Sequence, residues 1–332
     1  MRILFGLIVV AALTWSGLWV MGARLAKERL VGWFAEQQDQ GRVARNDGIA
    51  VRGFPNRLDA TVTAPELADP ATGWGWSAPF VQIMTLSYRP NHVIVALPDR
   101  QNVGTPLGDV DVASERLRAS AVFDLAPGFP LDRATLVGSD VALTLDATSV
   151  AMAEMRLAVD HLPDPGGSGA YRVGADLTQV TSRSGLDLPS IDEVRLDATL
   201  IYDTRWQSRG TTERPRLTRI EISDAGALWA DAEIGAEGTL DIGPDGRPVG
   251  QIDLRVENWR MLLNMAEVAG LTPAATRART EQALGFVEML SGTEGVIEVP
   301  LIFEDGRIMA GPMTIGPAPR LERPLDTAQP VR

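Results

Sequence analysis

The feature that most constrains this chain is an uninterrupted apolar run over residues 3–23, which contains no charged side chain. An α-helix rises about 1.5 Å per residue, so the run is long enough to cross a hydrocarbon core of about 30 Å. Charged residues flank it on both sides: Arg2 before it, and Arg24, Lys27, Glu28 and Arg29 after it. The sequence therefore predicts a transmembrane anchor at residues 1–23 that holds a water-facing body at a membrane.

The apolar run is predicted to be a retained anchor rather than a cleaved signal peptide. It exceeds the roughly 7–15 apolar residues of a signal peptide, and residues 21–23 match an A-x-A cleavage site poorly. Trp15 and Trp19 lie near its far end, where the membrane interface favours indole rings. The flanking basic residues by themselves would leave the body in the cytoplasm, but large domains translocate largely regardless of such charges. We expect a single-pass inner-membrane protein whose body lies in the periplasm.

Composition excludes several classes of function. The net charge of −12 argues against a nucleic-acid surface, which needs clustered Lys and Arg. The absence of cysteine excludes disulfides, thiol nucleophiles and Cys-ligated metals. Only two histidines are present, His92 and His161, which are too few for a multi-histidine zinc site. We expect no metal and no cofactor.

Residues 24–40 continue the helical pattern as a short stalk. One face carries Ala26, Leu30, Trp33, Phe34 and Gln37, and Glu28, Glu36, Gln38 and Asp39 are polar. We expect this apolar stripe to pack on the body; the alternative is that it lies on the membrane.

From about Gly48 onward, apolar residues recur every two residues rather than at helical intervals. Residues 58–64 alternate strictly between apolar and polar side chains, which is typical of an antiparallel strand with one buried face. Similar strand-like runs follow at residues 80–88, 91–97, 117–125, 134–136, 141–145, 155–159, 171–180, 191–202 and 217–223.

Two hairpins are predicted in the last third of the chain. The first hairpin spans residues 237–256 around a turn that contains Asp245-Gly246, and the second spans residues 296–310 around Asp305-Gly306. Asp-Gly supplies the positive φ angles that such turns need.

Two helices are predicted between these hairpins. Asn258 and Thr272 are suitable N-caps, and Gly270 and Gly292 are suitable C-terminal residues. Their apolar stripes are expected to pack on the sheet, with Leu262, Met265, Ala266 and Ala269 in the first helix and Ala283, Phe286, Val287 and Leu290 in the second.

These patterns predict a mainly β fold with some α structure. We expect a large antiparallel, curved sheet, or two β lobes, with two packed helices. The Pro- and Gly-rich residues 162–169 mark the best boundary, giving an N-terminal lobe at 41–165 and a C-terminal lobe at 166–316. Residues 317–332, with four prolines, are predicted to be a disordered tail.

The segment 73–78 matches the letters of the G-x-G-x-x-A dinucleotide fingerprint but not its expected structural context. That motif needs a preceding strand and a following helix. Here prolines surround it and a strand follows, so we interpret the match as chance. Its tryptophans either close the end of a β-core or form an exposed pair that contacts lipid or a partner. Trp74, Trp76 and Phe80 are accordingly the candidate ligand or partner contacts.

No catalytic signature accompanies the titratable residues. His92 has the chemistry of a general base, but no nucleophile elbow, metalloprotease or phosphate-loop motif occurs with it. A hydrogen-bonded structural histidine is the simpler interpretation. Carboxylate pairs such as Asp109 and Asp111 lack the spacing of a calcium loop. We therefore expect no catalytic residues and no enzyme.

Several motifs of the chain occur together in one known pattern: residues 53–59, 67–70, 73–80 and 86–94, and then 238–250, 258–259, 304–306 and 311–312. In this combination the sequence resembles the bacterial family catalogued as domain of unknown function 2125. The resemblance implies an uncharacterised envelope protein of a Gram-negative bacterium and transfers no catalytic residues. The anchor followed by long strands is also similar, in architecture alone, to AsmA-like envelope proteins, which build β-grooves for lipids.

The leading hypothesis is a non-enzymatic envelope protein that binds a lipid or another apolar ligand in a curved β-sheet. An alternative is a structural or assembly protein that docks envelope protein partners. A hydrolase is the third hypothesis, and it requires His92 to lie within hydrogen-bond reach of a Ser and an acid.

Overall fold

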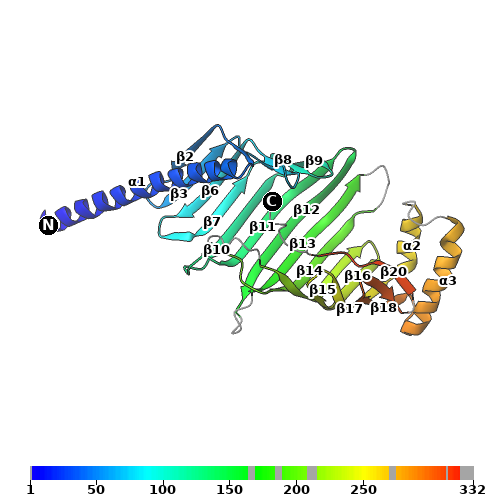
Figure 1. Ribbon diagram of the computed structural model, residues 1–332. Coiled ribbons are helices and arrows are strands. Elements are labelled where there is room, and N and C mark those ends of the chain that lie inside the picture. Colours follow the sequence, from blue (N-terminus) through cyan, green and yellow to red (C-terminus); the bar gives the residue numbers. More distant parts are fainter. Residues whose placement is uncertain are drawn as a thin grey trace, which may run out of the picture. The chain divides into compact units, whose positions relative to one another are not determined.

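The computed structural model describes residues 2–163, 169–183, 189–207, 215–268, 274–311 and 313–321 (Figure 1). These residues form three helices and a series of antiparallel paired strands, which confirms the predicted fold class. The helices are α1 (Arg2–Asp39), α2 (Trp259–Val268) and α3 (Ala274–Ser291).

The chain divides into two compact units. Unit 1 comprises Met1–Leu125 and Ala134–Glu154, and unit 2 comprises Ala126–Arg133 and Met155–Arg332. The division runs through β11 (Leu131–Leu145) and β12 (Thr148–Leu162), and so it differs from the predicted boundary at 165/166. Strand β12 continues to Leu162, and its part from Met155 onward already belongs to unit 2.

Unit 1 contains two runs of paired strands. One run is β2–β3–β6–β7–β10, and the other is β1–β4–β5–β8–β9–β11. The bounds are β1 Val43–Arg45, β2 Gly48–Arg52, β3 Arg57–Thr63, β4 Glu66–Asp69, β5 Trp74–Ser77, β6 Phe80–Leu86, β7 Arg89–Leu97, β8 Arg100–Thr105, β9 Gly108–Ala113 and β10 Arg116–Phe123.

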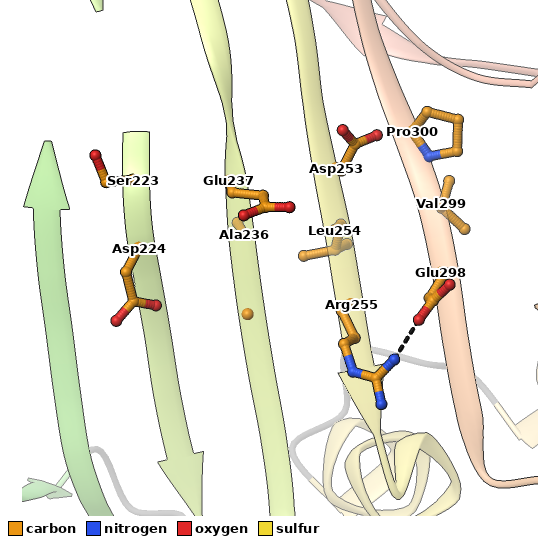
Figure 2. Close-up of a pocket in the computed structure, with 11 residues that line it drawn as sticks. Ser223, Asp224, Ala236, Glu237, Asp253, Leu254, Arg255, Glu298, Val299 and Pro300 are labelled. Atoms are coloured by element: carbon orange, nitrogen blue, oxygen red, sulfur yellow. Dashed lines mark hydrogen bonds and ion pairs between the residues drawn. The ribbon is translucent and has the colours of Figure 1, made fainter. Parts of the chain in front are cut away.

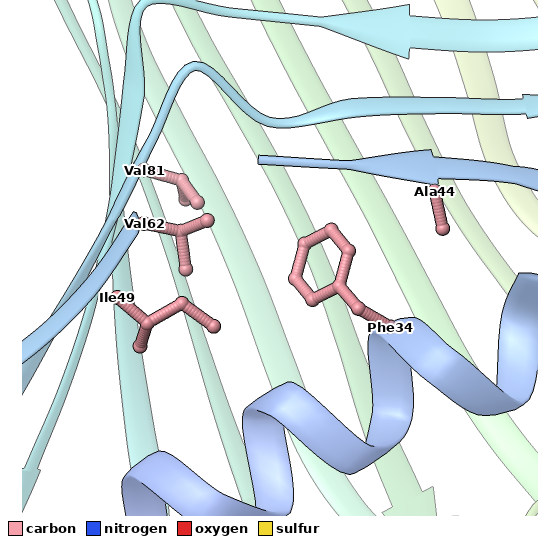
Figure 3. Packing of buried hydrophobic residues seen from close by; sticks show 5 residues of the cluster. All are labelled: Phe34, Ala44, Ile49, Val62 and Val81. Atoms are coloured by element: carbon pink, nitrogen blue, oxygen red, sulfur yellow. The ribbon is translucent and has the colours of Figure 1, made fainter. Parts of the chain in front are cut away.

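The predicted anchor and stalk form one continuous helix, α1, whose second half packs on the sheet of unit 1. Phe34 is buried against Ala44, Ile49, Val62 and Val81 (Figure 3). Leu30 adds to this cluster. The predicted packing of the stalk is therefore confirmed, except that Trp33 is exposed.

Unit 2 contains a consecutive antiparallel run from β13 to β20, in which each strand pairs with the next. The bounds are β13 Gly169–Arg183, β14 Ile191–Tyr202, β15 Leu217–Trp229, β16 Ala232–Ile242, β17 Pro248–Glu257, β18 Val296–Glu304, β19 Arg307–Ala310 and β20 Met313–Pro317. Both predicted hairpins are present, as β16–β17 and β18–β19.

Helices α2 and α3 pack on this sheet through a small cluster. Trp259 and Leu263 of α2 are buried with Ile297 of β18, and Leu284 and Val287 of α3 pack against them. Within the predicted α3 stripe, the inward position of Val287 is confirmed.

The rest of the predicted α3 stripe is wrong, because Ala283, Phe286 and Leu290 do not belong to the buried cluster, and the last two are largely exposed. The inward face instead carries the polar Glu288, which an apolar stripe cannot reveal. Met265 and Ala266 of α2 are half-buried, and Ala269 lies outside the described residues.

The chain remains ordered beyond the predicted start of the tail. Pro317 ends β20, Ala318 is buried with Leu240 and Phe303, and the Leu321 amide donates a hydrogen bond to the Gly246 carbonyl. Residues 317–321 thus differ from the prediction because Ala318 fills an apolar site. Residues 322–332 lie outside the described part of the chain.

Candidate ligand-contact surfaces

The two tryptophans of β5 lie on the same side of their strand but have different environments. Trp76 packs against the Phe34 cluster, and its indole Nε1–H donates a hydrogen bond of 2.7 Å to Gln101 Oε1. Trp74 is 55% exposed. Both line an open hollow of about 340 Å³ over β4, β5, β8 and β9. The predicted pair therefore divides into one structural ring and one ring that is free to contact a ligand.

Phe80, the third predicted contact, begins β6 opposite Thr63 and is partly exposed. It is not among the residues that line the Trp74 hollow. A neighbouring hollow of about 550 Å³ includes Pro79 and Arg100, but Phe80 does not line it either. Phe80 thus lies outside both of these hollows, whereas Trp74 and Trp76 share one of them.

A third hollow, of about 550 Å³, lies over β15–β18 in unit 2 (Figure 2). Carboxylates dominate its polar lining: Asp224, Glu237, Asp253 and Glu298. Arg255 forms ion pairs with Glu298 and Glu257, and Arg195 forms ion pairs with Asp224 and Glu233. These pairs satisfy much of the local charge, and within the described residues no group of three or more His, Cys, Asp or Glu side chains is arranged to hold a metal.

Among the described residues of unit 2, two carboxylates have shifted pKa values. Arg260 donates two hydrogen bonds to Glu288, of 3.0 and 2.7 Å, and the Gly295 amide donates another. These contacts hold the pKa of Glu288 below its ordinary value. A paired contact with Arg172 lowers the pKa of Asp197 in the same way. Both carboxylates are held by arginines across neighbouring elements, which is an arrangement that stabilises structure.

His92 has a hydroxyl partner on the neighbouring strand. Its Nε2 lies 3.0 Å from Ser120 Oγ, and the two residues belong to the paired strands β7 and β10. Within the described residues, no carboxylate hydrogen-bonds to His92. In that part of the chain, the pair is an imidazole and a hydroxyl in contact, without the carboxylate that orients the histidine of a catalytic triad.

A contact that the sequence did not predict joins α1 to the turn between β2 and β3. The Trp15 indole donates a hydrogen bond of 2.9 Å to the Pro55 carbonyl, and the Trp19 indole donates one of 2.7 Å to the Arg57 carbonyl. Phe54, at the tip of the turn, meets the Trp19 ring edge-on at 5.5 Å and remains 55% exposed. The sequence offered one signal for this turn: residues 53–59 are among the motifs that resemble the family.

Comparison with known proteins identifies the family. A family model described as "Uncharacterized protein conserved in bacteria (DUF2125)" matches residues 19–319. The chain belongs to this family. No curated protein and no solved structure matches the chain.

The family match of this DUF2125 protein includes the half of α1 that packs on unit 1. It begins at Trp19 and so takes in Phe34 and the turn that Trp19 contacts. It ends two residues beyond Pro317 and so takes in the buried Ala318. The matched region therefore contains the elements that both units need for their cores.

The DUF2125 protein also has an apolar row across unit 2 that runs perpendicular to the strands. The residues directly opposite one another from β13 to β18 are Ala175, Leu196, Ala225, Ala236, Leu254 and Val299. Directly opposite residues share one face of a sheet. We call this set the alanine row. Alternation alone could not reveal it, because the register of six strands decides which residues align.

The alanine row is only partly covered. Val299, at one end, packs in the cluster beneath α2 and α3, whose main sheet contacts are with β16 and β18. Leu196, near the other end, is 36% exposed. The rows on either side, on the same face, combine larger side chains such as Ile222 and Ile234 with small residues: Ala198, Ala227 and Gly238.

Proposed function

We propose that this DUF2125 protein is a membrane-anchored, non-enzymatic envelope protein that binds a lipid or another apolar ligand on the apolar face of its unit 2 sheet. Helix α1 is long and apolar enough to cross a membrane. We place the anchor in the inner membrane of a Gram-negative bacterium and the body in the periplasm. The long uncharged run and the absence of cysteine are compatible with this placement.

The observation that carries the proposal is the partly covered alanine row. Burying one methylene against apolar surface contributes about 0.8 kcal/mol. An acyl chain laid along the row would contact Leu196 and the alanines on either side of it, Ala175 and Ala225. Small side chains permit close approach, and Leu196 supplies exposed apolar area. Trp74 and Phe80 are proposed as further contacts in unit 1.

The non-enzymatic part of the proposal is supported by the environment of His92. A serine lies in contact with it, but within the described residues no carboxylate orients it. The perturbed carboxylates Glu288 and Asp197 are held by arginines in structural pairs. A hydrolase remains the weaker hypothesis.

The proposal is tested with two matched leucines. Leu196 is 36% exposed on the alanine row, and Leu228 is 37% exposed on the opposite face, where it pairs with Glu193. Full-length wild type, Leu196→Asp and Leu228→Asp are purified in mild detergent, and retained apolar ligands are extracted and identified by mass spectrometry. We expect the ligand in wild type and Leu228→Asp but not in Leu196→Asp. Equal amounts in all three, or none in wild type, would contradict the proposal.

A second candidate function, the docking of envelope proteins, is favoured by the outer face of α3. Phe286, Met289 and Leu290 are spaced at helical intervals and are all exposed. Such a patch is typical of a protein-binding surface. If this function holds, a protein recovered stoichiometrically with wild type is lost from Met289→Ser, and no bound lipid is found.

A further inference from the structure

The inference concerns how deeply unit 1 enters the membrane, and it rests on the proposal that α1 is a retained anchor. Trp15 and Trp19 lie inside the apolar run and are both hydrogen-bonded to the turn between β2 and β3. Further along α1, the backbone at Gly22 approaches Leu58 of β3. The turn and the start of β3 thus lie alongside α1 from Trp15 to Gly22, in the second half of the apolar run.

The length of α1 before this contact is too short to cross a membrane. Residues 3–14 extend over about 18 Å at about 1.5 Å per residue, whereas the hydrocarbon core is about 30 Å thick. The bilayer around α1 must therefore extend beyond Trp15 towards Ala23. The turn lies at that same level, so it cannot remain in bulk water when α1 spans the membrane.

The side chains at this end of unit 1 suit a membrane interface. Phe54 is 55% exposed, and Tyr88, in the turn between β6 and β7, is 61% exposed. The two turns are adjacent, because the Ser87 amide donates a hydrogen bond of 2.9 Å to the Asn56 carbonyl. Aromatic side chains are favoured at the boundary between headgroups and acyl chains.

Basic residues surround these aromatic side chains, although the whole chain is acidic. Arg52 ends β2 and Arg89 begins β7, and both are exposed. Arg57 is also exposed but is paired with Asp59 at 3.1 Å. On α1 the next charged residues after the apolar run are Arg24, Lys27 and Arg29, with one acid, Glu28, among them.

Backbone groups in the turn are also prepared for a dry environment. An unsatisfied carbonyl in hydrocarbon costs several kcal/mol, so lipid-exposed turns are avoided. The indole donors of Trp15 and Trp19 satisfy the Pro55 and Arg57 carbonyls. Both carbonyls therefore keep a hydrogen-bond partner in a place from which lipid excludes water.

We propose that the two adjacent turns of unit 1 insert into the interface of an anionic membrane. Phe54 and Tyr88 enter the boundary between headgroups and acyl chains, and Arg52 and Arg89 contact lipid phosphates. The inserted turns and α1 together fix the height of unit 1 above the bilayer. Phe80 belongs to the opposite end of unit 1, because it pairs with Thr63 at the far end of β3.

The experiment uses the absence of cysteine, so that one introduced cysteine labels one site. Phe54→Cys, Tyr88→Cys and Leu107→Cys are made in the full-length chain and labelled with an environment-sensitive fluorophore. Leu107 is the matched control, since it is an 85% exposed apolar residue of another turn of unit 1, between β8 and β9. Each variant is reconstituted into phosphatidylcholine vesicles with and without phosphatidylglycerol. Some vesicles carry a spin-labelled acyl chain as quencher.

We expect a blue shift and several-fold stronger quenching at positions 54 and 88 than at 107. We also expect phosphatidylglycerol to increase the quenching at 54, and Arg52→Gln with Arg89→Gln to remove that increase. Equal emission and quenching at all three positions would overturn the proposal that the turns insert into the membrane. If phosphatidylglycerol still increased the quenching after both arginines were replaced, the proposed contact of these arginines with lipid phosphates would be overturned. The fluorescence measurement needs no bound ligand. It therefore tests membrane insertion even if mass spectrometry finds no ligand extracted from the protein. Circular dichroism of each labelled variant establishes that it is folded.

Discussion

Each of the two tryptophan pairs of unit 1 lies on one face of its element, but the environments of their rings differ. Trp15 and Trp19 are four residues apart on α1, and Trp74 and Trp76 are two residues apart on β5. Each spacing places both rings on one face of its element. On α1 both indole donors bind carbonyls near the β2–β3 turn, whereas on β5 Trp76 binds Gln101 and Trp74 is exposed. Spacing predicts the shared face, but a partner distant in sequence determines the role of each ring.

The largest expected effect tests whether α1 is truly docked on unit 1. Phe34→Ala removes the ring at the centre of the cluster with Ile49 and Val62, and we expect it to lower the free energy of unfolding by about 3 to 5 kcal/mol. Val31→Ala, on the exposed side of the same helix, is expected to cost about 0.5 kcal/mol or less. Urea unfolding of the full chain in mild detergent measures both. Equal losses would mean that the helix does not pack as described.

The next effect separates the two rings of β5. Trp76→Phe keeps an aromatic ring but removes the donor to the buried Gln101, and we expect a loss of about 1 to 3 kcal/mol. Trp74→Phe is expected to change stability by about 0.5 kcal/mol or less. The same unfolding assay applies. A greater loss for Trp74→Phe would reverse the assignment of structural and free rings.

A smaller effect sharpens the role of the α1 pair. Trp19→Phe removes the hydrogen bond to the Arg57 carbonyl, and we expect it to cost about 1 kcal/mol. Its local signature is faster amide hydrogen exchange in residues 53–57, measured by mass spectrometry in vesicles. Exchange in α2 serves as the internal reference and should not change. Unchanged exchange at the turn would show that the indole contact does not hold it.

The smallest effect concerns pH and unit 2. Because its folded-state pKa is lowered by Arg260, Glu288 stabilises the folded state above its unfolded pKa of about 4.3, and this contribution is lost as pH falls through the folded pKa. We expect the protection of amides in α2 and α3, taken relative to the intrinsic exchange rate at each pH, to decrease at acidic pH in wild type. Glu288→Gln should show the lower protection already at neutral pH and a weaker dependence on acid. The same pH dependence in both proteins would rule out this carboxylate as its source.

Much of the fold could be predicted because its signals are local. The alternation of residues 58–64 predicts β3, and the Asp-Gly pairs predict the turns of the two hairpins in unit 2. The face of α3 that packs on the sheet could not be predicted in the same way. Its apolar residues cover more than one face, and the inward position of Glu288 depends on Arg260 in a different helix. The burial of Ala318 depends likewise on distant Leu240 and Phe303.

The candidate contacts were harder to predict, since they depend on register and on distant pairing. The sequence identified Trp74 as a notable aromatic, and its exposure agrees with a contact role that is still to be tested. It did not identify Phe54, whose position follows from a helix about 35 residues earlier in the chain. The position of Leu196 in the alanine row follows from the alignment of six strands, which no single-strand pattern contains.

The central claim, that an apolar ligand lies on the alanine row, is tested most directly by photo-crosslinking in native membranes. A photoreactive phenylalanine analogue is introduced at position 196 or, as the matched control, at position 228 of the full-length chain. The account predicts lipid-sized adducts at 196 and none at 228. Protein adducts at 196, or equal lipid adducts at both positions, would contradict it.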